Sequence, residues 1–226
     1  MDHPRAVLFD AYGTLFDVYS VGLLAEQLFP GQGQALALLW RDKQIEYTRL
    51  VSTSDEGAHY RPFWELTQAA LRHSCKRLGL DLPTAREQQL MNQYRHLSAF
   101  PETRPVLQAL KARGIATGIL SNGDPDMLAV AVRSAGLDGL LDHVLSAHAV
   151  RRYKTDARVY ALGPQALDLP ASQILFVSSN AWDALGATWY GYRTLWVRRW
   201  QQPYEELGTP PTREGSSLRD ALSFFD

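Results

Sequence analysis

The chain has 226 residues, of which 46% are hydrophobic and 21% charged, and its formal net charge is −1. This length accommodates one large domain or a core domain with a smaller insertion, and the composition is globular rather than disordered. The near-zero charge gives no electrostatic footprint for nucleic acid or for an anionic membrane surface. Because the sequence has neither a secretory h-region nor an apolar run of membrane-spanning length, we expect a soluble, cytoplasmic protein.

The first predicted element is a strand over residues 6–10, an apolar run that ends in the carboxylate of Asp10 and is followed by Gly13 and Thr14. An apolar run of this length bounded by turn residues is typical of a buried strand in a parallel sheet. Asp10 then lies at the carboxyl end of the strand, where ligand and catalytic groups gather in open α/β sheets. An isolated aspartate in this position would be a turn or helix-capping residue, so the interpretation depends on partners further along the chain.

Residues 19–98 show helical spacing and no convincing strand. The spacing predicts four helices, over residues 19–28, 34–54, 60–78 and 84–97. The single cysteine, Cys75, excludes an intramolecular disulfide and a cysteine-based zinc site. It lies on the apolar side of the third predicted helix, which favours packing over reactivity.

After Pro101 the pattern alternates between helices and strands. We expect helices over 103–113, 124–135, 155–167 and 181–189, and strands over 115–120, 143–147, 174–179 and 194–197. Alternation of this kind implies βαβ units and a parallel sheet. We therefore predict an α/β fold: a Rossmann-like parallel-sheet core (residues 1–15 and 100–226, with the catalytic crevice) and a four-helix cap domain (residues 16–99) inserted after the first strand. The Pro/Gly-rich stretch 208–217 is expected to be a surface tail before a short last helix.

Polar clusters follow three of the later strands: Ser121-Asn122-Gly123, residues 151–154 ending in Lys154, and residues 178–183 ending in Asp183. Each cluster alone is explained by turn and cap chemistry. Because the carboxyl ends of parallel strands meet at one edge, we expect the clusters to join Asp10 in a single crevice with the composition of a catalytic site. A lysine beside Asp10 would keep its carboxylate ionised, as a nucleophilic carboxylate requires.

These residues carry a resemblance to a known family. Asp10-Ala-Tyr-Gly-Thr14, Ser121-Asn122, Lys154 and residues 178–183 resemble the four motifs of the haloacid dehalogenase superfamily. More narrowly, FDAYGTLFDV, WRDKQIEYTRL, ILSNGD, RRYKTDARVY and LFVSSNAWDALGA resemble the (S)-2-haloacid dehalogenases, over residues 9–198 and including the cap. The resemblance implies hydrolysis of (S)-2-haloalkanoic acids to (R)-2-hydroxyalkanoic acids and halide, through an ester on Asp10 with inversion at C2. It implies no metal or cofactor, and a homodimer for which residues 36–40 offer an apolar surface.

The resemblance also assigns roles to residues at matching positions. Asp10 is the nucleophile, and Thr14 and Lys154 orient it and keep it charged. Arg41, with Asn122 beside it, takes the departing halide. The substrate carboxylate is expected at Ser121 and at backbone amides of the first loop, which include that of Ala11.

The remaining predicted site residues surround this set. Asn180 and Asp183 are expected to organise the hydrolytic water, and Ser178 and Tyr160 belong to the surrounding polar network, with Tyr160 also counted among the substrate-binding residues. The apolar wall around the alkyl group of the substrate is assigned to four residues: Tyr12, Ile45, Phe63 and Trp182. Thr155 stands where the family usually has proline and Arg198 where it commonly has asparagine, which bears on loop shape and substrate preference.

Three alternatives lead to different chemistry. Phosphatases of the superfamily generally carry a second aspartate two residues after the nucleophile and bind Mg²⁺, whereas this chain has Tyr12 there and Ser179-Asn180 in the last motif, which disfavours that activity. The dehalogenases that place an aspartate on a nucleophile elbow are disfavoured because the chain lacks G-x-D-x-G and its six histidines lie outside the clusters, His148 being nearest to Lys154. A non-catalytic binding protein on the same fold is the third alternative. It is disfavoured because four residues are intact: Asp10, Arg41, Lys154 and Asp183.

Overall fold

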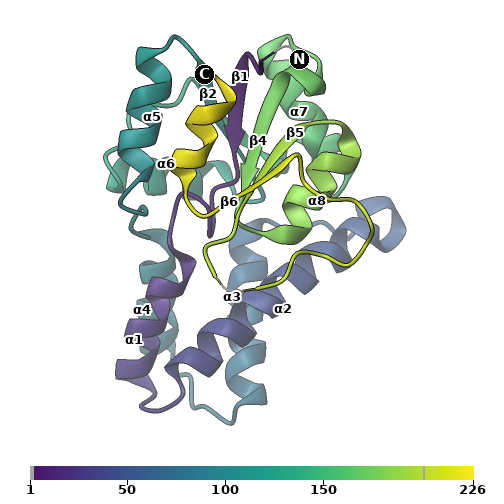
Figure 1. Cartoon of the computed structure of the whole chain (residues 1–226). Helices are drawn as coiled ribbons and strands as arrows, with labels where there is room; N and C mark the ends of the chain where they lie inside the picture. The colour runs from purple at the N-terminus through teal and green to yellow at the C-terminus, as the bar shows by residue number, and fades with distance from the viewer. Residues whose placement is uncertain (1–2, 201) are drawn as a thin grey trace.

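The computed structural model describes residues 3–200 and 202–226 and has a six-stranded parallel sheet at its centre (Figure 1). The strand order is β3-β2-β1-β4-β5-β6, with β1 (Ala6–Phe9) between β2 (Ala116–Ser121) and β4 (Ile174–Ser178). The other strands are β3 (His143–Ser146), β5 (Arg193–Val197) and β6 (Arg213–Gly215). Since Phe9 is level with Ile119 and Val177, Asp10 leaves the middle of the sheet beside the ends of both neighbours.

Four helices connect the strands and cover the sheet. Helices α5 (Thr103–Ala112) and α6 (Pro125–Ser134) lie on one side of it, and α7 (Ala157–Leu167) and α8 (Ala181–Tyr190) on the other (Figure 1). This arrangement follows from right-handed crossovers that run outward from β1 in both directions. Every residue of β1 and β4 is buried, as expected for strands packed on both faces.

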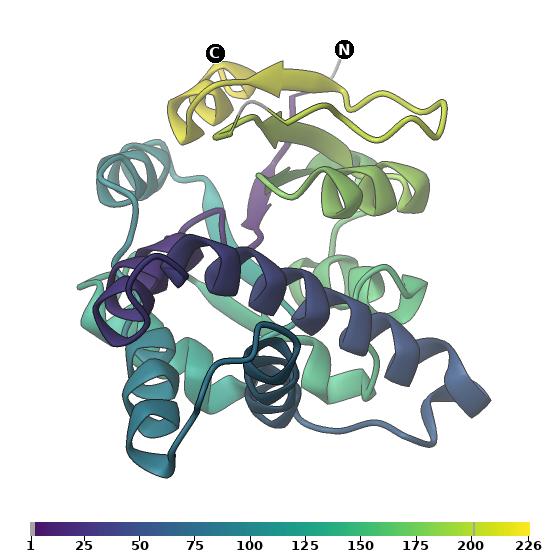
Figure 2. The same ribbon diagram turned by 90° about the horizontal axis from the view of Figure 1, so that it is seen from below.

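The helical block that follows β1 lies over the carboxyl ends of the strands (Figures 1 and 2). It consists of η1 (Val18–Ser20), α1 (Val21–Leu28), α2 (Gly33–Thr53), η2 (Ser54–Gly57), α3 (Phe63–Arg77) and α4 (Thr84–Arg95). The long helix α2 packs against α1 and α3, and the buried Trp40 of α2 donates from Nε1 to the carbonyl of Thr67 in α3 (2.8 Å). The predicted α/β fold with a helical cap after the first strand is confirmed. The boundaries of the two predicted domains stay a prediction. The first segment of the core domain, residues 1–15, begins with two residues outside the described range.

Three sequence-based expectations have different outcomes. Cys75 is buried in α3, as predicted, and burial raises the pKa of its thiol to about 11. Of the apolar surface expected at residues 36–40, Leu38 is exposed, whereas Leu36 and Trp40 pack inside the cap because they lie on the face that α2 turns toward its neighbours. The role of this stretch in a homodimer stays a prediction. No helix among residues 3–200 and 202–226 has both the length and the apolar character needed to cross a membrane.

The stretch 208–217 is mostly exposed, as expected of a surface tail, but it also contains the edge strand β6, which was not predicted. The strand has only three residues, none of which is buried. It therefore shows no alternation of apolar and polar side chains by which the sequence could reveal it. Its position is fixed instead by pairing with β5, next to which Thr194 and Thr212 exchange backbone-to-hydroxyl hydrogen bonds of 3.0 Å. The expected last helix is a 3-10 helix, η5 (Leu218–Phe224).

Candidate active site

The carboxylate of Asp10 lies at the carboxyl end of β1 and is nearly buried, with 6% of the residue exposed. Its Oδ1 accepts a hydrogen bond from Lys154 Nζ (3.0 Å), and its Oδ2 accepts from Thr14 Oγ1 (3.0 Å) and Asn180 Nδ2 (2.8 Å). Three hydrogen bonds, one of them from a cation, thus fix the direction of this carboxylate. The site therefore holds Asp10 as an oriented carboxylate.

The ammonium of Lys154 bridges two carboxylates, since it also lies 2.8 Å from Oδ2 of Asp183. Both Lys154 and Asp183 have fully buried side chains. Burial by itself would lower the pKa of Lys154, but the charges of Asp10 and Asp183 outweigh it and raise that pKa above its usual value. Burial raises the pKa of Asp183 to about 6, although Lys154 and a hydrogen bond from Tyr160 act in the opposite direction. At neutral pH the cluster consists of two carboxylates and one ammonium.

The loop after β1 is shaped to turn Thr14 back toward Asp10. The carbonyl of Ala11 accepts hydrogen bonds from three successive backbone N–H groups, those of Thr14, Leu15 and Phe16. Gly13 has φ +88°, a conformation that side chains disfavour, and so permits this tight turn. Thr14 Oγ1 then donates to Asp10 and accepts from the N–H of Ser179 (2.9 Å), which ties this loop to the end of β4.

At the ends of two other strands, a side chain accepts a hydrogen bond from the backbone N–H group of another site residue. Asn122, after β2, accepts a hydrogen bond from the N–H of Lys154 on its Oδ1 (2.9 Å). Ser178, at the end of β4, accepts from the N–H of Asn180 on its Oγ (3.1 Å). These contacts explain how residues from separate loops reach one position over β1, as the polar clusters predicted.

Arg41 reaches the site from the cap helix α2. Its guanidinium donates to the carbonyl of Tyr12 (3.2 Å) and to Oδ1 of Asn180 (3.3 Å), and it is held from behind by Oε1 of Gln44 (2.8 Å). Among the described residues no carboxylate forms an ion pair with Arg41. A fixed guanidinium with neutral partners is suited to binding an anion.

Next to Asp10 lies a small enclosed cavity of about 10 Å³, roughly the room of one water molecule. It is lined by Asp10, Tyr12, Arg41, Ile45, Thr48, Phe63, Ser121, Asn122 and Trp182. The ring of Tyr12 packs against Phe63 (5.8 Å between centroids) and stacks on Tyr94 (5.7 Å), and burial raises the pKa of the Tyr12 phenol well above its usual value. The wall opposite the carboxylate is therefore aromatic and uncharged.

The predicted site residues thus divide into two groups. Eight of them line the cavity, and the rest lie around Asp10 or behind it: Ala11, Thr14, Lys154, Tyr160, Ser178, Asn180 and Asp183. Tyr160 is not among the residues that line the cavity, and its hydroxyl donates to Oδ1 of Asp183 (2.8 Å), so its expected contact with substrate stays a prediction. Ala11 likewise contributes its carbonyl to the turn, and its expected amide contact with substrate stays a prediction.

Sequence reasoning missed Thr48 in the cavity wall and the support of Arg41. Gln44 is buried; its Oε1 accepts from both Arg41 and Tyr94 (3.1 Å), and its Nε2 donates to Thr67 (2.6 Å). A signal existed for Gln44, because it stands one helical turn from Arg41 within the family-like segment WRDKQ. Tyr94 and Thr67 come from other helices and had none.

Neither a metal cluster nor a catalytic histidine emerges from the described part of the chain. Residues 3–200 and 202–226 contain no group of three or more His, Cys, Asp or Glu side chains arranged to hold a metal ion, and the cation between Asp10 and Asp183 is the ammonium of Lys154. His148, the histidine expected nearest to Lys154, hydrogen-bonds through Nδ1 to the hydroxyl of Tyr60 (2.9 Å) and does not line the cavity.

Comparisons with known proteins agree with this geometry. Residues 4–191 match the family model of haloacid dehalogenase-like hydrolases. The (S)-2-haloacid dehalogenase of Pseudomonas sp. (strain YL) is 45% identical over 226 residues, which cover 100% of this chain and 96% of that protein. The (S)-2-haloacid dehalogenase H-109 of Pseudomonas putida is 42% identical, with 96% of each protein covered.

Solved structures give the same relationship. The crystal structure of an L-2-haloacid dehalogenase matches with a TM-score of 0.97 at 57% identity, covering 99% of both chains. That of the L-2-haloacid dehalogenase from Xanthobacter autotrophicus with chloropropionic acid covalently bound matches with a TM-score of 0.90 at 32% identity, covering 98% of both chains. The resemblance in the motifs thus extends over the whole length of the protein. The chain belongs to the haloacid dehalogenase-like hydrolases and, within them, to the (S)-2-haloacid dehalogenases.

Proposed function

We propose that this protein hydrolyses (S)-2-haloalkanoic acids to (R)-2-hydroxyalkanoic acids and halide. The observation that carries the proposal is the carboxylate of Asp10, which Lys154, Thr14 and Asn180 hold in place beside an aromatic cavity with the guanidinium of Arg41 at its edge. A relative solved with chloropropionic acid covalently bound supports a covalent route. The names of the curated relatives support the substrate class and its configuration.

In the first step Asp10 attacks C2 of the substrate from the side opposite the halogen. A bond forms between a carboxylate oxygen and C2, the carbon–halogen bond breaks with its electron pair leaving as halide, and C2 inverts. Arg41 and Asn122 receive the halide, and Ser121 with the backbone amides near Ala11 holds the substrate carboxylate. The aromatic wall of Tyr12 keeps water from the nucleophile, which strengthens it relative to a hydrated carboxylate.

In the second step water attacks the carbonyl carbon of the Asp10 ester. The bond between that carbon and the oxygen on C2 breaks, so the hydroxy acid leaves with its inverted configuration and Asp10 is restored as a carboxylate. Asp183 is the base that takes the proton of the water, with Asn180 as the positioning amide. A pKa of about 6 leaves Asp183 ionised at pH 7 and suits a base that works near neutrality.

The decisive experiment measures halide release from (S)- and (R)-2-chloropropionate in the presence of EDTA, for the wild type and for Asp10→Asn. We expect release from the (S) enantiomer alone, (R)-lactate as product, and a loss of at least about 10³-fold in the variant. Undiminished activity of Asp10→Asn, or a strict need for Mg²⁺, would contradict the proposal. Mg²⁺-dependent release of phosphate from p-nitrophenyl phosphate would favour the phosphatase alternative instead.

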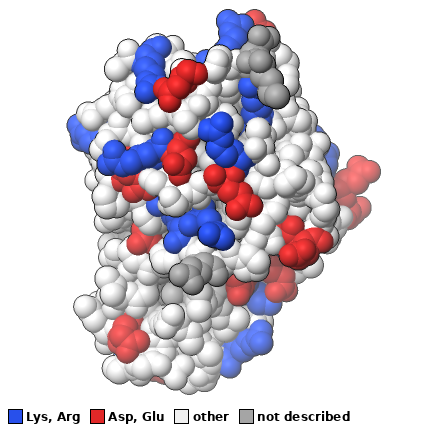
Figure 3. All heavy atoms as spheres, in the orientation of Figure 1, with Lys and Arg blue, Asp and Glu red and all other residues white. Residues whose placement is uncertain are grey.

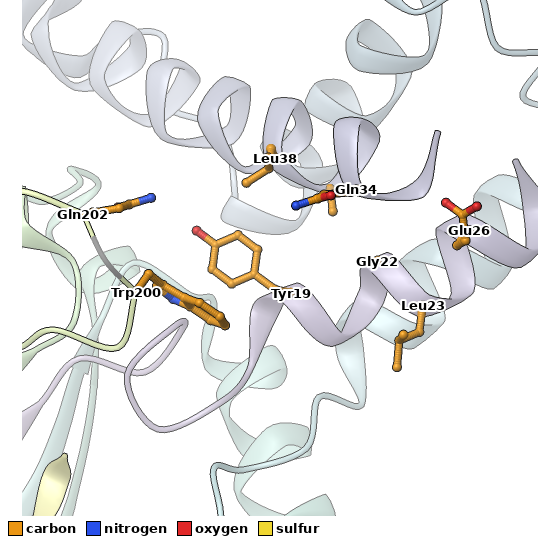
Figure 4. Close-up of a pocket in the computed structure, with 9 residues that line it drawn as sticks. Tyr19, Gly22, Leu23, Glu26, Gln34, Leu38, Trp200 and Gln202 are labelled. Carbon is orange, nitrogen blue, oxygen red and sulfur yellow. The ribbon is translucent and has the colours of Figure 1, made fainter. Parts of the chain in front are cut away.

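We further infer that the protein is a homodimer that associates through an apolar cavity between α1, α2 and the segment that contains Trp200 (Figure 4). The cavity has about 440 Å³ and includes Tyr19, Leu23, Leu38 and Trp200 among its lining. Leu23 is 74% exposed and Trp200 42%, and the one acid of the lining, Glu26, is engaged by the N–H groups of Gly31 and Gly33.

A second copy of this chain is the occupant that fits best, because a two-fold contact places the same uncharged surface on both sides. The lower part of the face in Figure 3, over the cap, carries few charges, whereas both signs are interspersed over the upper part. Sedimentation at micromolar concentration should give a dimer for the wild type and a monomer for Leu23→Glu, with Leu207→Glu, an exposed leucine outside this cavity, as the control. A wild-type monomer would contradict the inference. The cytoplasmic location expected from the sequence stays a prediction.

A further inference from the structure

Asp124 joins the sheet-bearing core to the cap through an unusual use of its carboxylate. It follows Ser121-Asn122-Gly123 after β2 and is the N-cap residue of α6, but its side chain makes no capping bond to that helix. Instead, its two oxygens accept hydrogen bonds from the backbone N–H groups of Phe63 (2.9 Å) and Trp64 (2.8 Å), the first two residues of α3. With 9% of Asp124 exposed, these contacts are largely shielded from water.

Helix α3 needs such a partner because it has no cap of its own. The residue before it is Pro62, whose side chain cannot accept a hydrogen bond. The first N–H groups of a helix lack partners within the helix and attract negative charge. Asp124, a residue of the sheet-bearing core, therefore supplies the carboxylate that caps the first turn of α3, because the cap domain, in its described residues, has no side chain of its own in that role.

Phe63 connects the contact between Asp124 and α3 to the active site. Its N–H is bound by Asp124, while its ring lines the cavity beside Asp10 and packs against Tyr12 (5.8 Å) and Tyr153 (6.0 Å). Ser121, three residues before Asp124, lines the same cavity from the opposite domain. The carboxylate of Asp124 thus fixes the distance between Ser121, which is assigned to binding the substrate carboxylate, and Phe63, which is assigned to the wall around the substrate's alkyl group.

We propose that Asp124 is a positioning residue that sets which alkyl chain length the enzyme accepts, by holding Phe63 at a fixed distance from Ser121. This inference rests on the proposed dehalogenase function. Loss of the two hydrogen bonds frees the first turn of α3, so Phe63 moves away from the cavity. The enlarged pocket then binds a short substrate less well and accommodates a longer one better.

The contacts around Asp124 do not offer a substitute. His148 Nδ1 lies 3.7 Å from Oδ1 of Asp124 and is itself bound to the hydroxyl of Tyr60. Among the described residues, the hydrogen bonds of the Phe63 and Trp64 N–H groups go to Asp124, and neither His148 nor Tyr60 accepts from them. The effect should therefore depend on the chemistry of residue 124 alone.

The test compares kcat/KM for (S)-2-bromohexanoate and (S)-2-bromopropionate in the wild type, Asp124→Asn and Asp124→Ala. We expect the long-to-short ratio to rise on the order of fivefold in Asp124→Ala, chiefly through a higher KM for the short substrate. The ratio of Asp124→Asn, which keeps the size of the side chain and one acceptor, should lie between those of the wild type and Asp124→Ala. The ratio does not depend on the active fraction of a preparation, so loss of stability alone leaves it unchanged.

The control is Asp142→Ala, since the carboxylate of Asp142 also accepts a backbone N–H, that of Thr117 (2.9 Å), but within the core and away from the cavity. Its ratio should equal that of the wild type. A second arm repeats Asp124→Ala in a Phe63→Ala background, where the variant should have no further effect on the ratio. An unchanged ratio in Asp124→Ala and Asp124→Asn, with an active wild type, would overturn this inference. A wild type that releases no halide would overturn the proposed function instead.

Discussion

The hydroxyl of Tyr160 donates a 2.8 Å hydrogen bond to Oδ1 of Asp183, in a part of the protein where both side chains are buried. Burial raises the pKa of Asp183 to about 6, and this hydrogen bond opposes the rise by stabilising the charged form. The role of Tyr160 is therefore electrostatic and acts through Asp183. In the proposed mechanism, where Asp183 is the base, this relationship sets the pH range in which the second chemical step can run.

We predict that kcat rises with pH through the pKa of Asp183 in the ester intermediate, which lies below about 6 because the ester removes the Asp10 charge that raises it, and that Tyr160→Phe moves this limb to higher pH. The step needs ionised Asp183, so activity is lost as pH falls below its pKa. Removing a donor to the charged form raises that pKa further, by about one unit, which corresponds to about 1.4 kcal/mol.

The measurement is kcat for (S)-2-chloropropionate between about pH 4 and 8, a range that brackets such a pKa. Tyr190→Phe is the matched control, because the ring of Tyr190 packs against Tyr160 (5.9 Å) without a hydrogen bond to Asp183. An acid limb at the same pH in Tyr160→Phe and the wild type would show that Asp183 does not control this step.

A second prediction concerns the charge balance at Lys154. Lys154→Met leaves two buried carboxylates without their cation, so we expect a loss of about 3–5 kcal/mol in the free energy of unfolding and of at least about 10³-fold in kcat/KM. Adding Asp183→Asn removes one of the unpaired charges and should recover part of the stability but none of the activity. Thermal unfolding and halide release of the three proteins separate these effects. Recovery of activity in the double variant would contradict the role of Asp183.

A third prediction follows the oxygen atoms. If water attacks the ester carbonyl, the product hydroxyl oxygen comes from Asp10, and the solvent oxygen stays on Asp10 after one turnover. A single turnover in H₂¹⁸O with excess enzyme should therefore label the peptide that contains Asp10 and leave the hydroxy acid unlabelled. After many turnovers both should carry the label. Label in the product of the first turnover would indicate direct attack of water on C2.

The sequence was sufficient for those parts of the site that local patterns encode. The run ending in Asp10 and the polar clusters at Ser121, Lys154 and Asp183 lie at strand ends, and a parallel sheet brings strand ends together whatever the details of packing. The same logic could not find Asp124 as the cap of α3, because its partners Phe63 and Trp64 lie about 60 positions away on a separate helix. The family resemblance places Tyr160 near the site without telling whether it faces the substrate or Asp183.

The last prediction tests the support of Arg41 by Gln44. Gln44→Met conserves volume but removes the acceptor that holds the guanidinium (2.8 Å), so Arg41 loses its fixed direction toward the carbonyl of Tyr12. We expect kcat to fall about tenfold, and inhibition by added bromide, a halide ion expected at the same position as the product chloride, to weaken by a similar factor. Lys43→Met is the matched control, since Lys43 is next to Gln44 on α2 but pairs with Glu46 (2.7 Å) outside the site. Bromide binding is measured by inhibition of 2-chloropropionate turnover, and it reports on Arg41 independently of the chemical step. Unchanged bromide inhibition in Gln44→Met would mean that Arg41 keeps its position without Gln44, or that the halide binds elsewhere.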